Sequence, residues 1–161
     1  MDEIERMHAE WACVRLTQDF CYLIDQRRYA ELAALFTEDG VWVRHGVRLE
    51  GRAAIVAALE TRPGNQFTRH VTTGFHFSEV TPESARATFY NVSHYTFERG
   101  EPPFVYRPGN ALILDFEDQF ENGPDGWRIA ERLTNATFLA AELYDRLHPA
   151  NTVARDSDRT P

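Results

Sequence analysis

Long runs of alternating apolar and polar residues fill the second half of this chain of 161 residues. The runs cover residues 68–80, 85–98, 104–120 and 126–139, and turn sequences rich in Pro, Gly and Asn separate them. Alternation with a period of two is typical of strands that bury one face. Consecutive strands joined by short turns predict an antiparallel sheet, and strands of this length usually curl.

The first half of the chain is expected to be helical, beginning with a long helix over residues 3–24. One apolar stripe on this helix contains Cys13, Leu16, Phe20, Leu23 and Ile24. A second stripe contains Trp11, Val14 and Cys21. A helix that is apolar on two sides is covered on two sides, so we expect the core on one side and a pocket or a partner subunit on the other.

Shorter helices are expected at residues 28–37 and 51–59, with a short strand at 41–44. Gly40 is expected to end the first of these helices, and Pro63 with Gly64 the second. Helices followed by a run of antiparallel strands indicate an α+β fold. We therefore expect one domain over residues 1–147 and a polar tail over residues 148–161.

Composition and charge narrow the choice of partners and compartment. The net charge of −8 argues against nucleic acid as a partner. The chain has no signal peptide and no long apolar run, which favours a cytoplasmic protein without a membrane anchor. Cys13 and Cys21 lie about 12 Å apart along the first helix, too far for a disulfide. The second helical stripe and the outer face of the sheet need cover, so a homodimer or homotrimer is expected.

Three segments carry a resemblance to a known superfamily. They are LIDQRRYAELAALFTEDGVW at residues 23–42, LEGRAAIVAAL at 49–59 and DGWRIAERL at 125–133. Through them the chain resembles the nuclear transport factor 2-like superfamily, and within it the SnoaL-like branch that includes scytalone dehydratase and hexachlorocyclohexane dehydrochlorinase. The resemblance implies a cone-shaped, strongly curved mixed or antiparallel sheet closed by the three N-terminal helices, like an α+β barrel.

The same resemblance implies a pair of residues for proton transfer. In the lyases of the superfamily, an aspartate at the end of the first helix orients a histidine on the first long strand, and Asp25 and His70 match these places. A neutral imidazole can accept a proton near pH 7, and a buried carboxylate fixes its tautomer. Asp25 alone would also suit the N-cap of the next helix. His70 alone would also suit a strand position without a chemical role.

Other pocket residues are expected on the second long strand and among the aromatic side chains. In scytalone dehydratase a second histidine on this strand helps the hydroxyl group to leave, and here that position falls nearest to Tyr95, with His94 one residue away. Strand alternation places Asn91 and Tyr95 on one face and His94 on the other, so Asn91 and Tyr95 are expected in the pocket unless a β-bulge brings in His94. Trp42 and Phe89 are expected among the aromatic residues of the pocket wall.

Arg132, on the last strand, could bind an anionic substrate, although a surface or salt-bridged arginine is the commoner role. The sequence contains no cluster of His and carboxylate residues with metal-ligand spacing, and it contains no nucleotide-binding motif. We therefore expect neither a metal nor a cofactor.

The expected function is that of a cofactor-independent, dehydratase-like lyase. Asp25 and His70 would abstract a proton from a small, largely apolar cyclic or aromatic substrate. An isomerase or cyclase would use the same pair and differ only in where the electrons go. Two further alternatives stay open, because the superfamily also includes non-catalytic subunits. One is a structural β subunit like that of the ring-hydroxylating dioxygenases, and the other is a ligand-binding protein.

Overall fold

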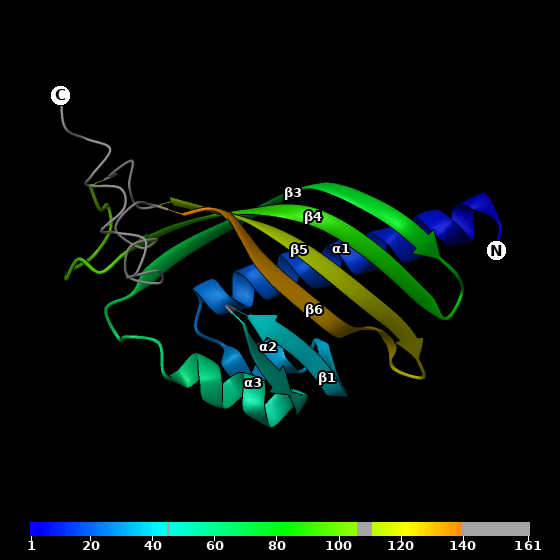
Figure 1. The fold of residues 1–161 in the computed structure, drawn as a ribbon, viewed down its shortest axis with the longest axis horizontal. Helices are drawn as coiled ribbons and strands as arrows, with labels where there is room; N and C mark the ends of the chain where they lie inside the picture. The colour runs from blue at the N-terminus through cyan, green and yellow to red at the C-terminus, as the bar shows by residue number, and fades with distance from the viewer. Residues whose placement is uncertain (45, 106–110, 140–161) are drawn as a thin grey trace, which may run out of the picture.

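The computed structural model describes residues 1–44, 46–105 and 111–139. The helices precede the long strands, and the α+β class is confirmed (Figure 1). The helices are α1 (Glu3–Asp25), α2 (Tyr29–Ala33) and α3 (Gly51–Glu60). The strands are β1 (Phe36–Arg44), β2 (Val47–Glu50), β3 (Phe67–Val80), β4 (Ser84–Thr96), β5 (Ala111–Gly123) and β6 (Gly126–Phe138).

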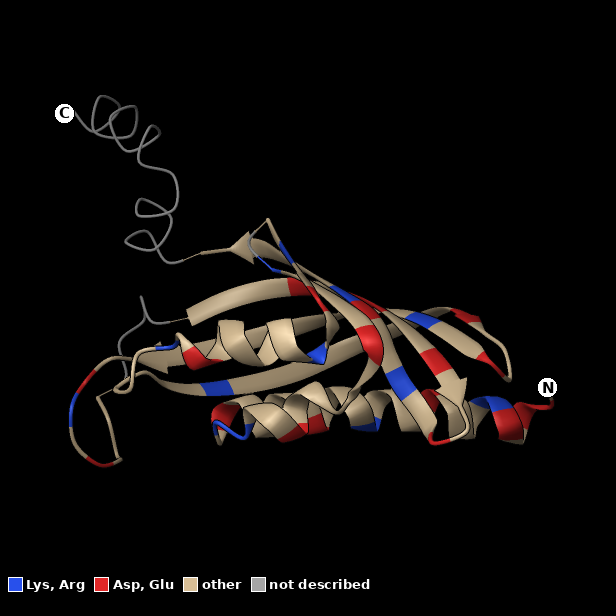
Figure 2. Cartoon of the chain, turned by 90° about the horizontal axis from the view of Figure 1, so that it is seen from below, with Lys and Arg blue, Asp and Glu red and all other residues tan. Residues whose placement is uncertain are grey.

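All of these strands join one curved sheet in the order β2-β1-β6-β5-β4-β3. The long strands pair with their neighbours in antiparallel fashion, whereas β1 pairs with β6 in parallel. The sheet is therefore mixed. The helices lie on one side of it, and α1 runs along its concave face (Figures 1 and 2). This is the helix-covered, cone-like arrangement that the resemblance implied.

The core fills the space between the helices and the concave face of the sheet. From α1 it takes Cys13, Phe20 and Ile24, which belong to the first apolar stripe and are buried as expected. The second stripe is divided, because Cys21 is buried whereas the Trp11 side chain is 60% exposed. Trp11 therefore contributes nothing to the core of the single chain.

The boundary between α2 and β1 differs from the sequence prediction. The helix expected over residues 28–37 ends at Ala33, and the strand begins at Phe36, which aligns with Ile129 of β6. Gly40 ends no helix but lies inside β1, where an added Cβ would come within 2.9 Å of the Cβ of Phe36. Pairing with β6 overrides the local helical spacing, because a strand partner supplies the backbone hydrogen bonds of this segment.

Two further boundaries differ, and part of the prediction lies outside the described residues. The four-residue strand β2 was not expected, and the strand expected over residues 104–120 begins at Ala111 and continues to Gly123. Residues 106–110 and the expected polar tail over residues 148–161 are outside the described part of the chain. Within the described part, no helix combines the length and the apolar character needed to cross a membrane.

Candidate functional site

Asp25 is the last residue of α1, and the turn that follows directs its side chain toward the sheet. Arg27 adopts a positive φ of 57°, and α2 starts two residues later. The N-cap of α2 is Arg28, and no side chain caps this helix. The N-cap interpretation of Asp25 is therefore wrong.

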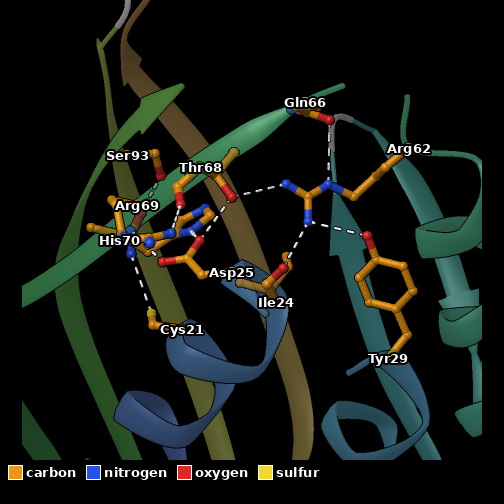
Figure 3. A network of polar contacts seen from close by, with 11 residues as sticks. Cys21, Ile24, Asp25, Tyr29, Arg62, Gln66, Thr68, Arg69, His70 and Ser93 are labelled. Atoms are coloured by element: carbon orange, nitrogen blue, oxygen red, sulfur yellow. Dashed lines mark hydrogen bonds and ion pairs between the residues drawn. The ribbon is translucent and has the colours of Figure 1, made fainter. Parts of the chain in front are cut away.

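The carboxylate of Asp25 contacts β3 through both of its oxygens (Figure 3). Its Oδ1 accepts a hydrogen bond of 2.8 Å from the Thr68 hydroxyl and lies 2.6 Å from Nδ1 of His70. Its Oδ2 accepts a bond of 3.0 Å from the backbone N–H of His70. Thr68 and His70 are two residues apart and so share one face of the strand. The end of α1 and the start of β3 are thus joined by one carboxylate.

The Asp25–His70 pair is largely withdrawn from solvent. The Asp25 side chain is 7% exposed and the His70 side chain 13%. Burial by itself would raise the pKa of Asp25, but the bonds from the His70 ring, from Thr68 and from the His70 amide hold that pKa below its ordinary value. An ionised carboxylate can only accept, so Nδ1 of His70 carries a proton, and in the neutral form of the ring Nε2 carries the lone pair.

The lowered pKa of Asp25 predicts a loss of stability in acid. Because the native state binds fewer protons than the unfolded chain, Asp25 stabilises the fold fully above its unfolded pKa of about 3.9 and loses this effect as the pH falls through the lower native pKa. We expect the free energy of unfolding, measured by urea titration below about pH 4, to fall more steeply for the wild type than for Asp25→Asn. Asp39→Asn, on the exposed part of β1, controls for the loss of one negative charge. Equal slopes for wild type and Asp25→Asn would contradict the prediction.

Arg62, in the loop after α3, holds this arrangement in place. Its Nη2 donates a bond of 3.0 Å to the Thr68 hydroxyl, and its Nη1 donates a bond of 3.0 Å to the carbonyl oxygen of Ile24. The Thr68 hydroxyl therefore accepts from Arg62 and donates to Asp25 (Figure 3). Arg62 and Thr68 were missed from the sequence, although alternation places Thr68 on the face of His70.

The register of β3 and β4 decides which side chains of β4 share the face of His70. Opposite residues of an antiparallel pair point to the same side of the sheet. His70 lies opposite Ser93, and Thr68 lies opposite Tyr95. His94 lies opposite Arg69 on the other face. No register shift occurs between residues 67 and 73 of β3, so no bulge exchanges Tyr95 for His94.

Asn91 and Ser93 form a short polar chain on the face of β4 that His70 shares. The Ser93 hydroxyl donates to Oδ1 of Asn91 at 2.6 Å, and Nδ2 of Asn91 lies 3.6 Å from Sγ of Cys21. Asn91 is fully buried, and both ends of its side-chain amide are used in these two contacts. Burial raises the pKa of the Cys21 thiol to about 12, which excludes a thiolate nucleophile at neutral pH.

The family follows from comparison with known proteins. A model of the SnoaL-like domain matches residues 5–133 of the chain. The chain belongs to the SnoaL-like domain family. No curated protein matches the sequence.

Solved structures support the same fold. A protein from Novosphingobium aromaticivorans named as a scytalone dehydratase is 21% identical, with a TM-score of 0.69 over 85% of this chain and 89% of its own. A type 2 hexachlorocyclohexane dehydrochlorinase (LinA) is 14% identical, with a TM-score of 0.68 over 85% and 90%. A Catenulispora acidiphila protein in complex with S-DNPA is 25% identical, with a TM-score of 0.62 over 80% and 94%.

The two aromatic residues expected in the pocket wall of this SnoaL-like domain belong to the packed core. Nε1 of Trp42 donates to the Thr134 hydroxyl at 2.9 Å, and the Trp42 ring meets the Phe20 ring edge-on at 5.2 Å between centroids. Phe89 stacks on Phe75 at 4.7 Å. Trp42 and Phe89 are 2% and 1% exposed. Both side chains therefore pack against other side chains of the domain.

Arg132 does not lie on the surface, and most of its guanidinium group is already used in contacts within the protein. It is completely buried, and its Nε donates to Oδ1 of Asp118 at 2.8 Å while Nη2 donates to Oδ2. The surface alternative for Arg132 is wrong, and the salt-bridged alternative describes it. In the part of the chain that the structure describes, no group of three or more His, Cys, Asp and Glu side chains is arranged to hold a metal ion.

Proposed function

We propose that this SnoaL-like domain is a cofactor-independent lyase of the dehydratase type. The observation that carries the proposal is the 2.6 Å contact between Nδ1 of His70 and Oδ1 of Asp25. It leaves Nε2 of His70 with a lone pair, in a ring that is mostly buried but still partly exposed. A neutral imidazole held in this way is suited to remove a proton from carbon near pH 7.

In the proposed reaction, Nε2 of His70 accepts a proton from a carbon next to a carbonyl or a similar electron-withdrawing group. The electron pair of the broken C–H bond forms a double bond to the neighbouring carbon, from which a hydroxyl group departs. That hydroxyl takes up the proton that Nε2 of His70 has accepted and leaves as water, so the products are an alkene and water and the His70 ring returns to its neutral form. The Asp25 carboxylate stabilises the imidazolium that forms, since it already contacts Nδ1.

Residues that share the face of His70 are candidates for binding the substrate oxygen that gains charge. Tyr95 is one of them, because it lies opposite Thr68 in the sheet. Ser93 also lies opposite His70, but its single hydroxyl proton is already donated to Oδ1 of Asn91. The Tyr95 hydroxyl is therefore the better candidate to donate to an enolate-like oxygen. Asn91 is a weaker candidate than the sequence suggested, because its amide contacts Ser93 and Cys21.

The proposal is tested by following proton removal directly. The protein is incubated in heavy water with a panel of small cyclic and aromatic β-hydroxy carbonyl compounds, and NMR records deuterium at the α-carbon and loss of water. We expect at least one compound to show both, faster than in buffer. Exchange without loss of water would identify an isomerase or cyclase that uses the same base. Exchange that His70→Ala leaves unchanged would contradict the assigned role of His70.

A further inference from the structure

Two guanidinium groups contact the hydroxyl of Tyr29, beside the candidate base, and a third lies nearby. Nη1 of Arg27 and Nη1 of Arg62 each lie 3.5 Å from Oη of Tyr29. Arg44, at the end of β1, is near enough to Tyr29 and Arg62 for their charges to influence its pKa. Figure 3 shows Tyr29 and Arg62 next to the Asp25–His70 contact. We call Arg27, Arg44 and Arg62 the arginine cluster.

The hydrogen bonds of the arginine cluster do not neutralise its charge. Nη2 of Arg27 donates to the carbonyl oxygens of Pro63 and Gln66, both at 2.6 Å. Arg62 donates to a carbonyl oxygen, to the Thr68 hydroxyl and to the Gln66 side chain. All of these acceptors are uncharged. The two guanidinium groups are therefore held in position while their positive charge stays available to a ligand.

Arg44 is the member of the cluster whose donors are unused. Within the described residues, its guanidinium makes no hydrogen bond or ion pair, and its Cζ lies 5.2 Å from the centroid of the Trp42 ring. Burial, together with the charge of Arg62, lowers the pKa of Arg44. An arginine keeps its proton at neutral pH even so. A half-buried charge without a partner is unfavourable, and an anionic ligand would remove that penalty.

Arg44 also faces the correct side of the sheet. Trp42 and Arg44 are two residues apart in β1 and therefore share a face, and Trp42 packs against Phe20 of α1. His70 contacts the same helix through Asp25. Arg44 and His70 therefore both lie on the concave face of the sheet, which the helices cover. Their strands, β1 and β3, lie toward opposite edges of the sheet.

The local charge around the site contrasts with that of the whole chain. The chain carries a formal charge of −8, whereas the arginine cluster places three positive charges near the carboxylate of Asp25. A partly buried cluster acts on a ligand more strongly than distant surface charges, which solvent and salt screen. The cluster therefore favours an anion in this place although the protein as a whole is acidic.

We propose that Arg44, supported by Arg27 and Arg62, binds a carboxylate group of the substrate. The forked guanidinium group matches the two oxygens of a carboxylate. The proposed lyase then acts on small cyclic or aromatic acids and not on neutral analogues. This extension rests on the proposed function for the reaction, but binding of the anion does not depend on catalysis.

The test compares three ring compounds that differ in charge: benzoate, phenyl phosphate and the neutral benzamide. Dissociation constants are measured by NMR titration for the wild type, Arg44→Gln and Arg44→Lys. We expect the wild type to bind benzoate more tightly than benzamide, and Arg44→Gln to bind benzoate about ten- to a hundredfold more weakly, as the loss of a charge-assisted hydrogen bond implies. Arg44→Lys should retain part of the affinity, because it keeps the charge but loses the fork.

Arg48 provides the matched control for a lost positive charge. It lies exposed on β2 and pairs with Glu50 and Glu131, so Arg48→Gln should bind benzoate like the wild type. Circular dichroism checks that each variant is folded. Absence of benzoate binding, or equal binding of benzoate and benzamide, would overturn the proposal. Tighter binding of phenyl phosphate than of benzoate would overturn the choice of a carboxylate.

The same measurements separate the anion site from the lyase activity. Benzoate binding that depends on Arg44, in a protein that dehydrates none of the carboxylic acids offered, would support the anion site and count against the lyase. Turnover of neutral hydroxy ketones that is unaffected by Arg44→Gln would support the lyase and count against the anion site.

Discussion

Replacing His70 with Ala is expected to lower kcat by about 10²–10⁴-fold on any substrate that the wild-type protein dehydrates. The reason is the loss of the group that accepts the proton, since Nε2 of His70 carries the lone pair that the contact with Asp25 makes available. Because the His70 side chain is 13% exposed and lies at the edge of the core, the fold should persist. Steady-state kinetics measure the effect, and circular dichroism with a ligand titration checks folding and binding.

Asp25→Asn and His76→Ala complete this experiment. An asparagine can present its N–H to Nδ1 of His70 and so favour the tautomer with the proton on Nε2, which cannot accept another. Asp25→Asn should therefore lower kcat in the same direction as His70→Ala. His76 lies exposed on the same strand, and His76→Ala should keep wild-type activity. A kcat that survives both the Asp25 and the His70 replacement would exclude the pair as the proton acceptor.

The long elements of the fold could be predicted because their patterns extend over many residues. The first apolar stripe of α1 is mostly buried, and along β4 and β5 buried residues alternate with more exposed ones, as the repeat predicts. The segment around α2 and β1 could not be predicted in the same way. Its residues have helical spacing, but Phe36 pairs with Ile129 of β6, far along the chain. Such pairing is decided by the tertiary structure, and short elements have too few residues to reveal it.

The candidate site was only partly visible in the sequence. The association of Asp25 with His70 came from the family resemblance, since no spacing rule brings together residues 45 positions apart. The same holds for the arginine cluster, whose members come from two loops and the end of a strand. A preference for aspartate at helix N-termini pointed the other way for Asp25. The geometry resolves this conflict, because its carboxylate accepts three bonds from β3 and none from α2.

The buried ion pair between Asp118 and Arg132 gives the largest expected effect on stability. Both side chains are completely withdrawn from solvent, and the Arg132 guanidinium lies 4.1 Å above the Phe20 ring and 4.9 Å from the Phe116 ring. Burial raises the pKa of the Asp118 carboxyl, and the Arg132 guanidinium opposes this rise. Among the described residues, Nη1 of Arg132 has no hydrogen-bond partner. The guanidinium therefore depends on Asp118 for its counter-charge.

Asp118→Asn is expected to lower the free energy of unfolding by about 3–5 kcal/mol, because it leaves a buried positive charge without its counter-charge. That is a large part of the total stability of about 5–15 kcal/mol that is usual for a domain. Urea unfolding measures the change, provided that the slope of the transition stays constant. Glu50→Gln, which breaks an exposed ion pair with Arg48, should change the stability only slightly.

The double variant Asp118→Leu with Arg132→Met distinguishes two explanations for a large loss of stability in Asp118→Asn. If the loss reflects the uncompensated charge, removing both charged groups should restore most of the stability, because apolar side chains of similar size fill the space and need no counter-charge. If the double variant stays as unstable as Asp118→Asn, removing the charge is not sufficient, because the apolar side chains do not replace the contacts of Arg132 with Phe20 and Phe116. Recovery in the double variant would mean that the ion pair contributes little net stability. The pair would then have another role in the core. Because Asp118 and Arg132 lie opposite each other on β5 and β6, that role would be to specify the register of these two strands.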